Sequence, residues 1–239
     1  MIAAPFFSGN RGRVQVYRRQ AGVWTASQVI VSPTPQDQSQ FGRKLVLSGD
    51  WLAISQPESV GSSDSMRGSV HLYHRALERW NLVQTLRGTQ TGADFYRFGD
   101  GLDLEGGNLA VTADVIRGDE RASSVRIYRL RAALWELEQT LENVTTRVNQ
   151  AAVLTMKLHR SVLVLGNPWR LSKEGWNVGE VKIFRRQSGA SGSWKHEQTL
   201  LTDPKVGAQR FGESVGFTDA GEMLATSSRS LWSSSWNGK

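Results

Sequence analysis

The residues that could do chemistry are few and scattered along the chain. The four histidines are His71, His74, His159 and His196. His71 and His74 in "HLYH" are three residues apart, so on a strand their rings point to opposite faces and cannot share a metal ion. We expect both to be surface or packing residues. No phosphate-binding loop, Gly-x-Ser-x-Gly turn or paired-carboxylate motif occurs, and the chain has no cysteine. We therefore expect no cofactor, metal site or disulfide.

Two segments have the composition of a binding surface. "NPWRLSKEGWNVG" (167–179) contains Trp169 and Trp176 with Arg170 and Lys173, and the tail "SLWSSSWNGK" contains Trp232 and Trp236. Tryptophan and arginine in loops are typical of interaction hot spots and of stacking on sugar rings. The alternative is that these rings fold back over the end of a sheet, and the sequence leaves both open.

The tripeptide Arg117-Gly118-Asp119 matches the Arg-Gly-Asp ligand of integrins and lies between two expected strands, where a loop would expose it. Three residues match easily by chance, and polar residues are common in turns, so coincidence is the simpler interpretation.

The charge of the 239-residue chain is +7, which fits acidic partners such as nucleic acid, anionic glycans or an acidic protein surface. The basic residues are scattered without a run of five or more, so we expect a diffuse positive surface and no specific nucleic-acid motif. No stretch is apolar enough to span a membrane, and no signal peptide is visible at the start.

The elements that must position these residues repeat along the sequence. Tryptophans recur as Trp24, Trp80, Trp135 and Trp194, each followed four residues later by a glutamine, namely Gln28, Gln84, Gln139 and Gln198. Before each tryptophan lies a segment of period-two alternation, such as "GSVHLY" before Trp80, ending in an aromatic residue. Each copy is therefore expected to be a strand, a turn and a second strand.

A second pair of strands precedes each of these hairpins. It is clearest in "FGRKLVLSGDWLAISQP" from Phe41 and "FGDGLDLEGGNLAVTAD" from Phe98, and again from Phe211, whereas the copy from Ala151 lacks the Phe-Gly. Short turns with Gly, Asp or Asn join the two strands. One period of about 55 residues thus predicts four antiparallel strands that must stack on neighbouring units to bury their faces.

These linked features resemble the FG-GAP repeats of the integrin α-subunit propeller and of its bacterial relatives, over nearly the whole chain. The resemblance implies an all-β fold, a β-propeller of four-stranded antiparallel blades. It implies one domain over 1–239, with periods at roughly 1–40, 41–97, 98–149 and 150–210 and a partial one at 211–239. Because about four periods are present, we expect either an incomplete or an unusually small propeller. Turns such as "SGDW" and "EGGN" contain at most one or two acidic residues, so we expect no calcium site of the kind common in this family.

Two classes of function fit these observations. We favour a non-catalytic binding or scaffold module that recognises a protein partner or a glycan through its loops, as a subunit of a larger assembly. The resemblance implies adhesion and an extracellular or cell-surface location. The alternative is a propeller-type hydrolase or lyase with carboxylates at a central channel, for which Asp64, Asp94, Asp100, Asp114 and Asp119 are candidates. The repeated tryptophans, Trp24 included, are expected to be buried between neighbouring blades.

Overall fold

The protein is an all-β chain built from antiparallel sheets. The computed structural model describes residues 1–57, 68–88, 94–117, 120–148, 155–172, 177–188, 192–202 and 210–227. In this part of the chain the only helical element is the single turn α1 (Phe7–Asn10). No helix among the described residues is long and apolar enough to cross a membrane.

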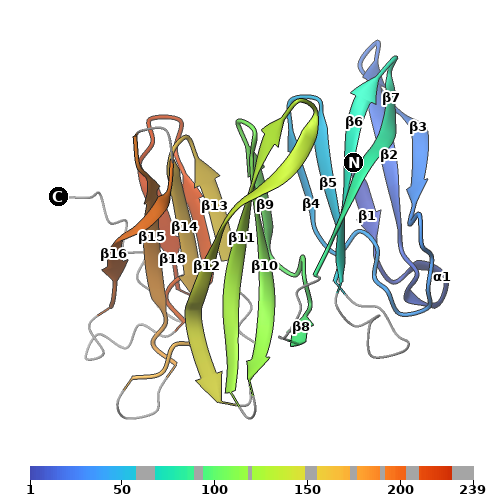
Figure 1. Cartoon of the computed structure of the whole chain (residues 1–239). Coiled ribbons are helices and arrows are strands. Elements are labelled where there is room, and N and C mark those ends of the chain that lie inside the picture. The colour runs from blue at the N-terminus through green and yellow to red at the C-terminus, as the bar shows by residue number, and fades with distance from the viewer. Residues whose placement is uncertain are drawn as a thin grey trace.

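Five sheets follow one another along the chain (Figure 1). The first sheet consists of β1 (Ile2–Ala4), β2 (Arg13–Gln20) and β3 (Val23–Val31). The second consists of β4 (Leu45–Ser48), β5 (Trp51–Gln56), β6 (Ser69–Ala76) and β7 (Arg79–Arg87). The third contains β8 (Asp94–Tyr96), β9 (Leu102–Glu105), β10 (Asn108–Arg117), β11 (Glu120–Arg131) and β12 (Leu134–Val148).

The fourth sheet consists of β13 (Thr155–His159), β14 (Val162–Asn167), β15 (Glu180–Arg186) and β16 (Trp194–Leu200), and the fifth of β17 (Ser214–Phe217) and β18 (Met223–Thr226). Consecutive strands pair antiparallel, as the two hairpins of each period predict. One strand departs from the expected periods, because β8 lies within 41–97 but pairs with the far end of β10.

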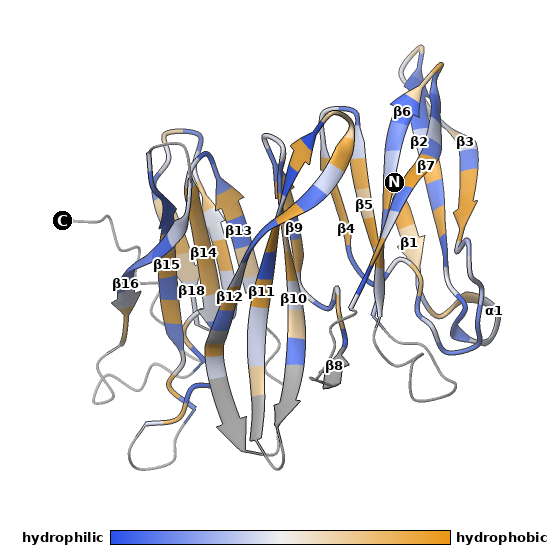
Figure 2. Cartoon of the chain, viewed as in Figure 1, coloured by the Kyte–Doolittle hydropathy of each residue, from blue (hydrophilic) through white to orange (hydrophobic). Residues whose placement is uncertain are grey.

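The core lies between the sheets. Three clusters of buried side chains join the first sheet to the second, the second to the third and the third to the fourth. Strands β4, β9, β13 and β17, which we call the inner strands, contact one another in that order. Strands β5 and β14 are apolar over most of their length (Figure 2), as expected for strands that are buried on both faces. In Figure 1 the first sheet lies at the right, and the fourth and fifth sheets overlap at the left.

The repeated tryptophan and glutamine lie on opposite faces of the same strand. These residues lie in the last two strands of the first four sheets, β2–β3, β6–β7, β11–β12 and β15–β16, which we call the outer hairpins. All four outer hairpins have a register shift at the same place, for example between Leu72 and Tyr73 in β6 opposite β7. Four residues along a regular strand return to the same face, but one bulged residue reverses this. The tryptophan therefore faces the preceding sheet, and the glutamine faces the following one.

Each glutamine that faces a following outer hairpin binds the backbone of that hairpin's tryptophan. The Gln84 amide nitrogen donates to the Trp135 carbonyl at 3.0 Å, and the Trp135 N–H donates to Gln84 Oε1 at 2.8 Å. The same two bonds join Gln28 to Trp80, at 2.9 Å each, and Gln139 to Trp194, at 2.9 and 2.7 Å. We call this reciprocal pair of hydrogen bonds the Gln–Trp clasp.

The Phe-Gly pair also acts between sheets. The Phe98 ring is fully buried, and its backbone lies against Gly68 at the start of β6 in the preceding sheet. Gly68 has φ of +72°, and a Cβ there would lie 2.4 Å from the Phe98 carbonyl oxygen. Gly99 in turn donates its N–H to the Thr112 carbonyl of its own sheet at 2.9 Å. The Phe-Gly pair thus fixes the segment before β9 of the third sheet against the start of β6 in the second sheet.

The expected burial of the repeated tryptophans is confirmed for three of them and wrong for the first. Trp80, Trp135 and Trp194 are 7%, 2% and 2% exposed, whereas Trp24 is 65% exposed. Since each tryptophan is covered by the sheet that precedes its own, and the first sheet has no described sheet before it, the Trp24 ring remains at the surface.

Candidate binding sites

The loop after β14 is only partly available for binding. Trp169 is half-buried, and the guanidinium of Arg210 lies over its ring at 4.2 Å from the centroid. Arg170 forms an ion pair with Glu180 at 3.5 Å, and its carbonyl accepts hydrogen bonds from Val178 and Gly179. Both residues are therefore held by contacts with the start of β15, with the residues just before it and with Arg210, and their role in binding stays a prediction.

Four of the other expected binding residues lie outside the described part of the chain: Lys173, Trp176, Trp232 and Trp236. Of the Arg-Gly-Asp tripeptide, Arg117 ends β10, while Gly118 and Asp119 lie outside the described residues. The role of these residues in binding therefore stays a prediction.

Two of the candidate carboxylates of the hydrolase alternative, Asp100 and Asp114, have partners that the structure describes. Asp100 is held by Arg97 at 3.1 Å and lies 3.9 Å from Arg43, and Asp114 accepts a hydrogen bond from Ser123 at 2.9 Å. Asp94 belongs to β8, and Asp64 and Asp119 lie outside the described residues.

One carboxylate has a raised pKa, and it joins two sheets. Burial raises the pKa of Asp103 in β9, opposed by hydrogen bonds from the Leu158 N–H and the Lys157 ammonium of β13. The bond to Leu158 is 2.6 Å long and crosses from the third sheet to the fourth. A single buried carboxylate bound to backbone and lysine in this way acts as a structural link.

The histidines behave as packing residues. His71 is fully buried in the second sheet, and its ring nitrogens lie within 3.2 Å of Ser69, Gln56 and Thr85. This burial lowers the pKa of His71 to about 4, so the ring is neutral at pH 7. His74 is edge-on to Trp51 on the other face of the strand, as the spacing predicts. In the described part of the chain, no three acidic or histidine side chains are placed to hold a metal ion.

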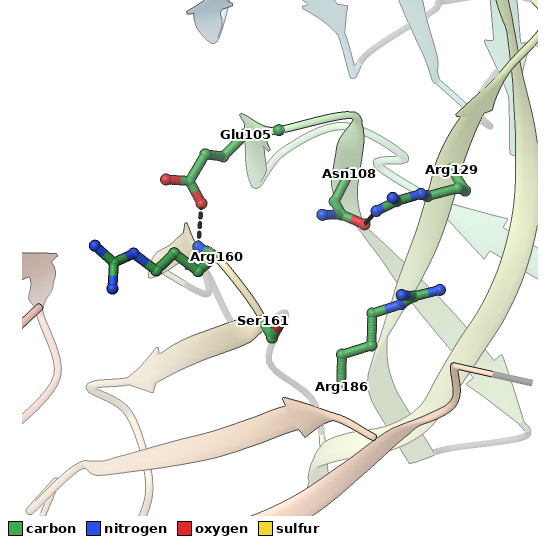
Figure 3. A pocket seen from close by; sticks show the side chains of 7 residues that line it. Glu105, Asn108, Arg129, Arg160, Ser161 and Arg186 are labelled. Carbon is green, nitrogen blue, oxygen red and sulfur yellow. Dashed lines mark hydrogen bonds between the residues drawn. The ribbon is translucent and has the colours of Figure 1, made fainter. Parts of the chain in front are cut away.

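A basic pocket of about 360 Å³ lies between the third and fourth sheets, and the sequence analysis missed it. Its walls come from the β9–β10 turn, the β13–β14 turn and the ends of β11 and β15; the lining side chains that matter are Arg129, Arg160, Arg186, Glu105, Asn108 and Ser161 (Figure 3). Because these residues come from four separated segments, no local motif indicates the pocket.

Two of the three arginines in this pocket keep their charge free of a carboxylate. Arg186 is paired with Glu138 at 2.8 Å, and Glu105 accepts the Arg160 backbone N–H at 2.5 Å. Arg129 instead donates to the neutral amide oxygen of Asn108 at 2.7 Å. Figure 3 shows the Arg129 guanidinium against Asn108 and that of Arg160 directed away from it. Among the described residues, neither Arg129 nor Arg160 has an ion pair, and of these two only the Arg129 guanidinium faces the other lining residues, so Arg129 is the group that offers an uncompensated positive charge to a ligand in the pocket.

A second recess, of about 430 Å³, lies on the first sheet. It is lined by Met1, Ile2, Tyr17 and Trp24, and Ile2 and Trp24 are both largely exposed. The repeat predicts that Trp24 packs against a preceding sheet. No described sheet precedes the first one, so this packing surface is uncovered and forms the recess.

No profile of a known protein family matches the chain, and no functionally characterised protein matches it significantly. The likeness to FG-GAP repeats therefore rests on the repeated residues themselves.

Proposed function

We propose that the chain is a non-catalytic binding and scaffold module whose sheets are blades of a β-propeller of the FG-GAP type. In support, each complete sheet has the strand order of a blade, and Phe-Gly, the tryptophan and the glutamine all act at contacts between sheets. On this proposal the fold is a platform on which inter-sheet grooves and loops carry the ligand site, as in adhesion proteins.

The observation that carries the ligand proposal is the basic pocket between the third and fourth sheets. Planar guanidinium groups bind carboxylate and sulfate through paired charge-assisted hydrogen bonds. The Asn108 amide and the Ser161 hydroxyl beside them can bind sugar hydroxyls. A volume of about 360 Å³ is near the lower end of small-ligand pockets and fits one acidic sugar residue or one acidic side chain. The ligand is therefore an acidic group on a glycan or on a protein partner.

The test is calorimetric titration with oligosaccharides of equal length that carry uronic acid, sulfate or no charge, and with an acidic peptide. We expect the charged ligands to bind and the neutral one not to bind. Arg129→Gln should weaken binding by about 10-fold or more, because a hydrogen bond to a charged group is worth about 1.5–3 kcal/mol. Binding should also weaken with added salt.

The matched control is Arg79→Gln, which removes the same charge from an exposed position on β7 remote from the pocket. It should leave the affinity within about 2-fold. If Arg79→Gln weakens binding as much as Arg129→Gln does, attraction depends on net charge alone and the pocket is not the site. Binding of the neutral oligosaccharide as strongly as the charged ones would also reject the proposal.

A further inference from the structure

The Gln–Trp clasp leaves one unused half at each end of the series of sheets. It forms three times inside the chain, from Gln28, Gln84 and Gln139. The fourth glutamine, Gln198, is exposed, and the first tryptophan, Trp24, is 65% exposed. Gln198 and Trp24 thus occupy the repeat positions that form the two halves of a clasp elsewhere in the chain.

The tryptophan half lies on the first sheet. Tyr17 and Trp24 occupy the positions that Tyr73 and Trp80 occupy in the second sheet, where both rings are buried against the sheet before. In the first sheet Tyr17 is half-buried, and the two rings line the recess of about 430 Å³. This face therefore has the side chains of an inter-sheet contact without the covering sheet.

The glutamine half lies on the fourth sheet. Gln198 is opposite Ile183 in the strand register, as Gln84 is opposite Leu72 and Gln139 is opposite Ile127. Leu72 and Ile127 are fully buried, whereas Ile183 is only partly buried. The fifth sheet covers β13 and β14, but its two described strands leave the outer strands β15 and β16 without the same cover.

The first and fifth sheets also complement each other in the strands that the structure describes. The fifth sheet has β17 and β18, which correspond to β4 and β5 of the second sheet, and the first sheet has β2 and β3, which correspond to β6 and β7, together with the three-residue β1. Setting β2 beside β18 would reproduce the strand order of the second sheet and place Trp24 where Gln198 can clasp it. β1 occupies that edge of β2 through only three residue pairs, and Ile2 is 61% exposed, so its displacement costs little packing.

We propose that a second copy of this chain docks head to tail, so that Gln198 of one copy clasps the backbone of Trp24 of the other. The template is the internal contact, which the chain already makes three times with the same atoms. A head-to-tail contact uses two different surfaces, so repeating it either closes a ring or builds a filament. We expect a dimer as the first product of this contact.

Sedimentation velocity over a range of about 0.1 to 100 µM tests the proposal. The wild-type chain should form dimers with increasing concentration. Trp24→Ala should raise the dissociation constant by about 30-fold or more, as expected when a central buried tryptophan is lost from an interface. Gln198→Ala should raise it by about 10-fold through the loss of two hydrogen bonds. Both residues are exposed in the single chain, so both variants should keep the wild-type monomer's thermal stability.

The controls are neighbouring exposed residues on the same strands. Val23→Ala on β3 and Lys195→Ala on β16 should each leave the dissociation constant within about 2-fold. A mixture of the Trp24→Ala chain with the Gln198→Ala chain adds a decisive arm. The mixed dimer contains one intact clasp, formed by Gln198 of the first chain and Trp24 of the second, so the mixture should dimerise more tightly than either variant alone.

A monomer at every concentration would overturn the proposal and leave the two faces to a partner of different sequence. A dimer that is insensitive to both substitutions would overturn it as well. A dimer weakened by Trp24→Ala whose affinity is not restored in the mixture would show that the contact joins two identical faces, which also contradicts a head-to-tail clasp.

Discussion

Replacing Gln84 by alanine should destabilise the protein by removing one Gln–Trp clasp. Gln84 lies on β7 and makes two hydrogen bonds across the gap to the third sheet, both with the backbone of Trp135. Trp135 is 2% exposed, so its ring holds this backbone in place whether or not the glutamine is present. The substitution therefore leaves a backbone N–H and a carbonyl without their partner in a half-buried position.

The expected loss follows from these two bonds. A hydrogen bond contributes about 0.5–1.5 kcal/mol net, and stranded buried groups add to the cost, so Gln84→Ala should lower the free energy of unfolding by about 2 kcal/mol. For a chain of this length, 1 kcal/mol corresponds to a fall of about 2–4 °C in the melting temperature. We expect a fall of about 4–8 °C. Gln84→Glu should cost at least as much, since a carboxylate would face the Trp135 carbonyl.

The assay is urea unfolding followed by far-UV circular dichroism, with scanning calorimetry for the melting temperature. Gln198→Ala is the matched control, because it makes the same change at the same position of the repeat where the side chain is exposed. In dilute monomer it should change stability by less than about 0.5 kcal/mol. Equal effects of Gln84→Ala and Gln198→Ala, or no loss from the former, would refute the role of the clasp.

Two further predictions concern buried side chains. Trp135→Ala should lower the free energy of unfolding by about 3–5 kcal/mol, while Trp24→Ala in the monomer should cost less than about 0.5 kcal/mol; comparable losses in urea titrations would contradict the burial of one and the exposure of the other. Burial lowers the pKa of His71 from 6.5 to about 4, so its contribution is complete above pH 6.5 and should be lost as the pH falls to 4, by about 3 kcal/mol. His71→Gln should flatten that pH dependence of urea unfolding, and an unchanged slope would reject it.

Much of the fold could be predicted because its signals are local. Period-two alternation and Gly/Asp/Asn turns identify each hairpin within about twenty residues, and the order of strands follows from consecutive hairpins. The direction in which a side chain faces is less accessible. The recurrence of Trp80 and Gln84 indicates a shared role, but regular spacing would put both on one face. Only the bulge between them, which has no residue signature of its own, turns them to opposite sheets.

The parts that could not be predicted depend on neighbouring sheets rather than on the residue's own strand. Trp24 has the same local sequence pattern as Trp80 and a different environment, because among the described sheets only that of Trp80 has another sheet before it. The basic pocket likewise joins Arg129 of the third sheet to Arg160 and Arg186 of the fourth. These residues are brought together by stacking, so their spacing in the sequence carries no signal of the site.

The one irregular repeat shows that the stacking contacts constrain the sequence in pairs. Where Phe98 lies against the preceding sheet, the facing residue is Gly68, and a side chain there would collide with the Phe98 carbonyl. The fourth period lacks Phe-Gly, and the residue corresponding to Gly68 in the sheet before it is Ser123. Ser123 donates to Asp114 within its own sheet instead. Loss of the phenylalanine and loss of the glycine thus coincide, as expected if each exists only to fit the other. The repeat residues are therefore selected by the contact between sheets, and a sheet face that keeps them, as the first sheet keeps Tyr17 and Trp24, retains the chemistry of that contact.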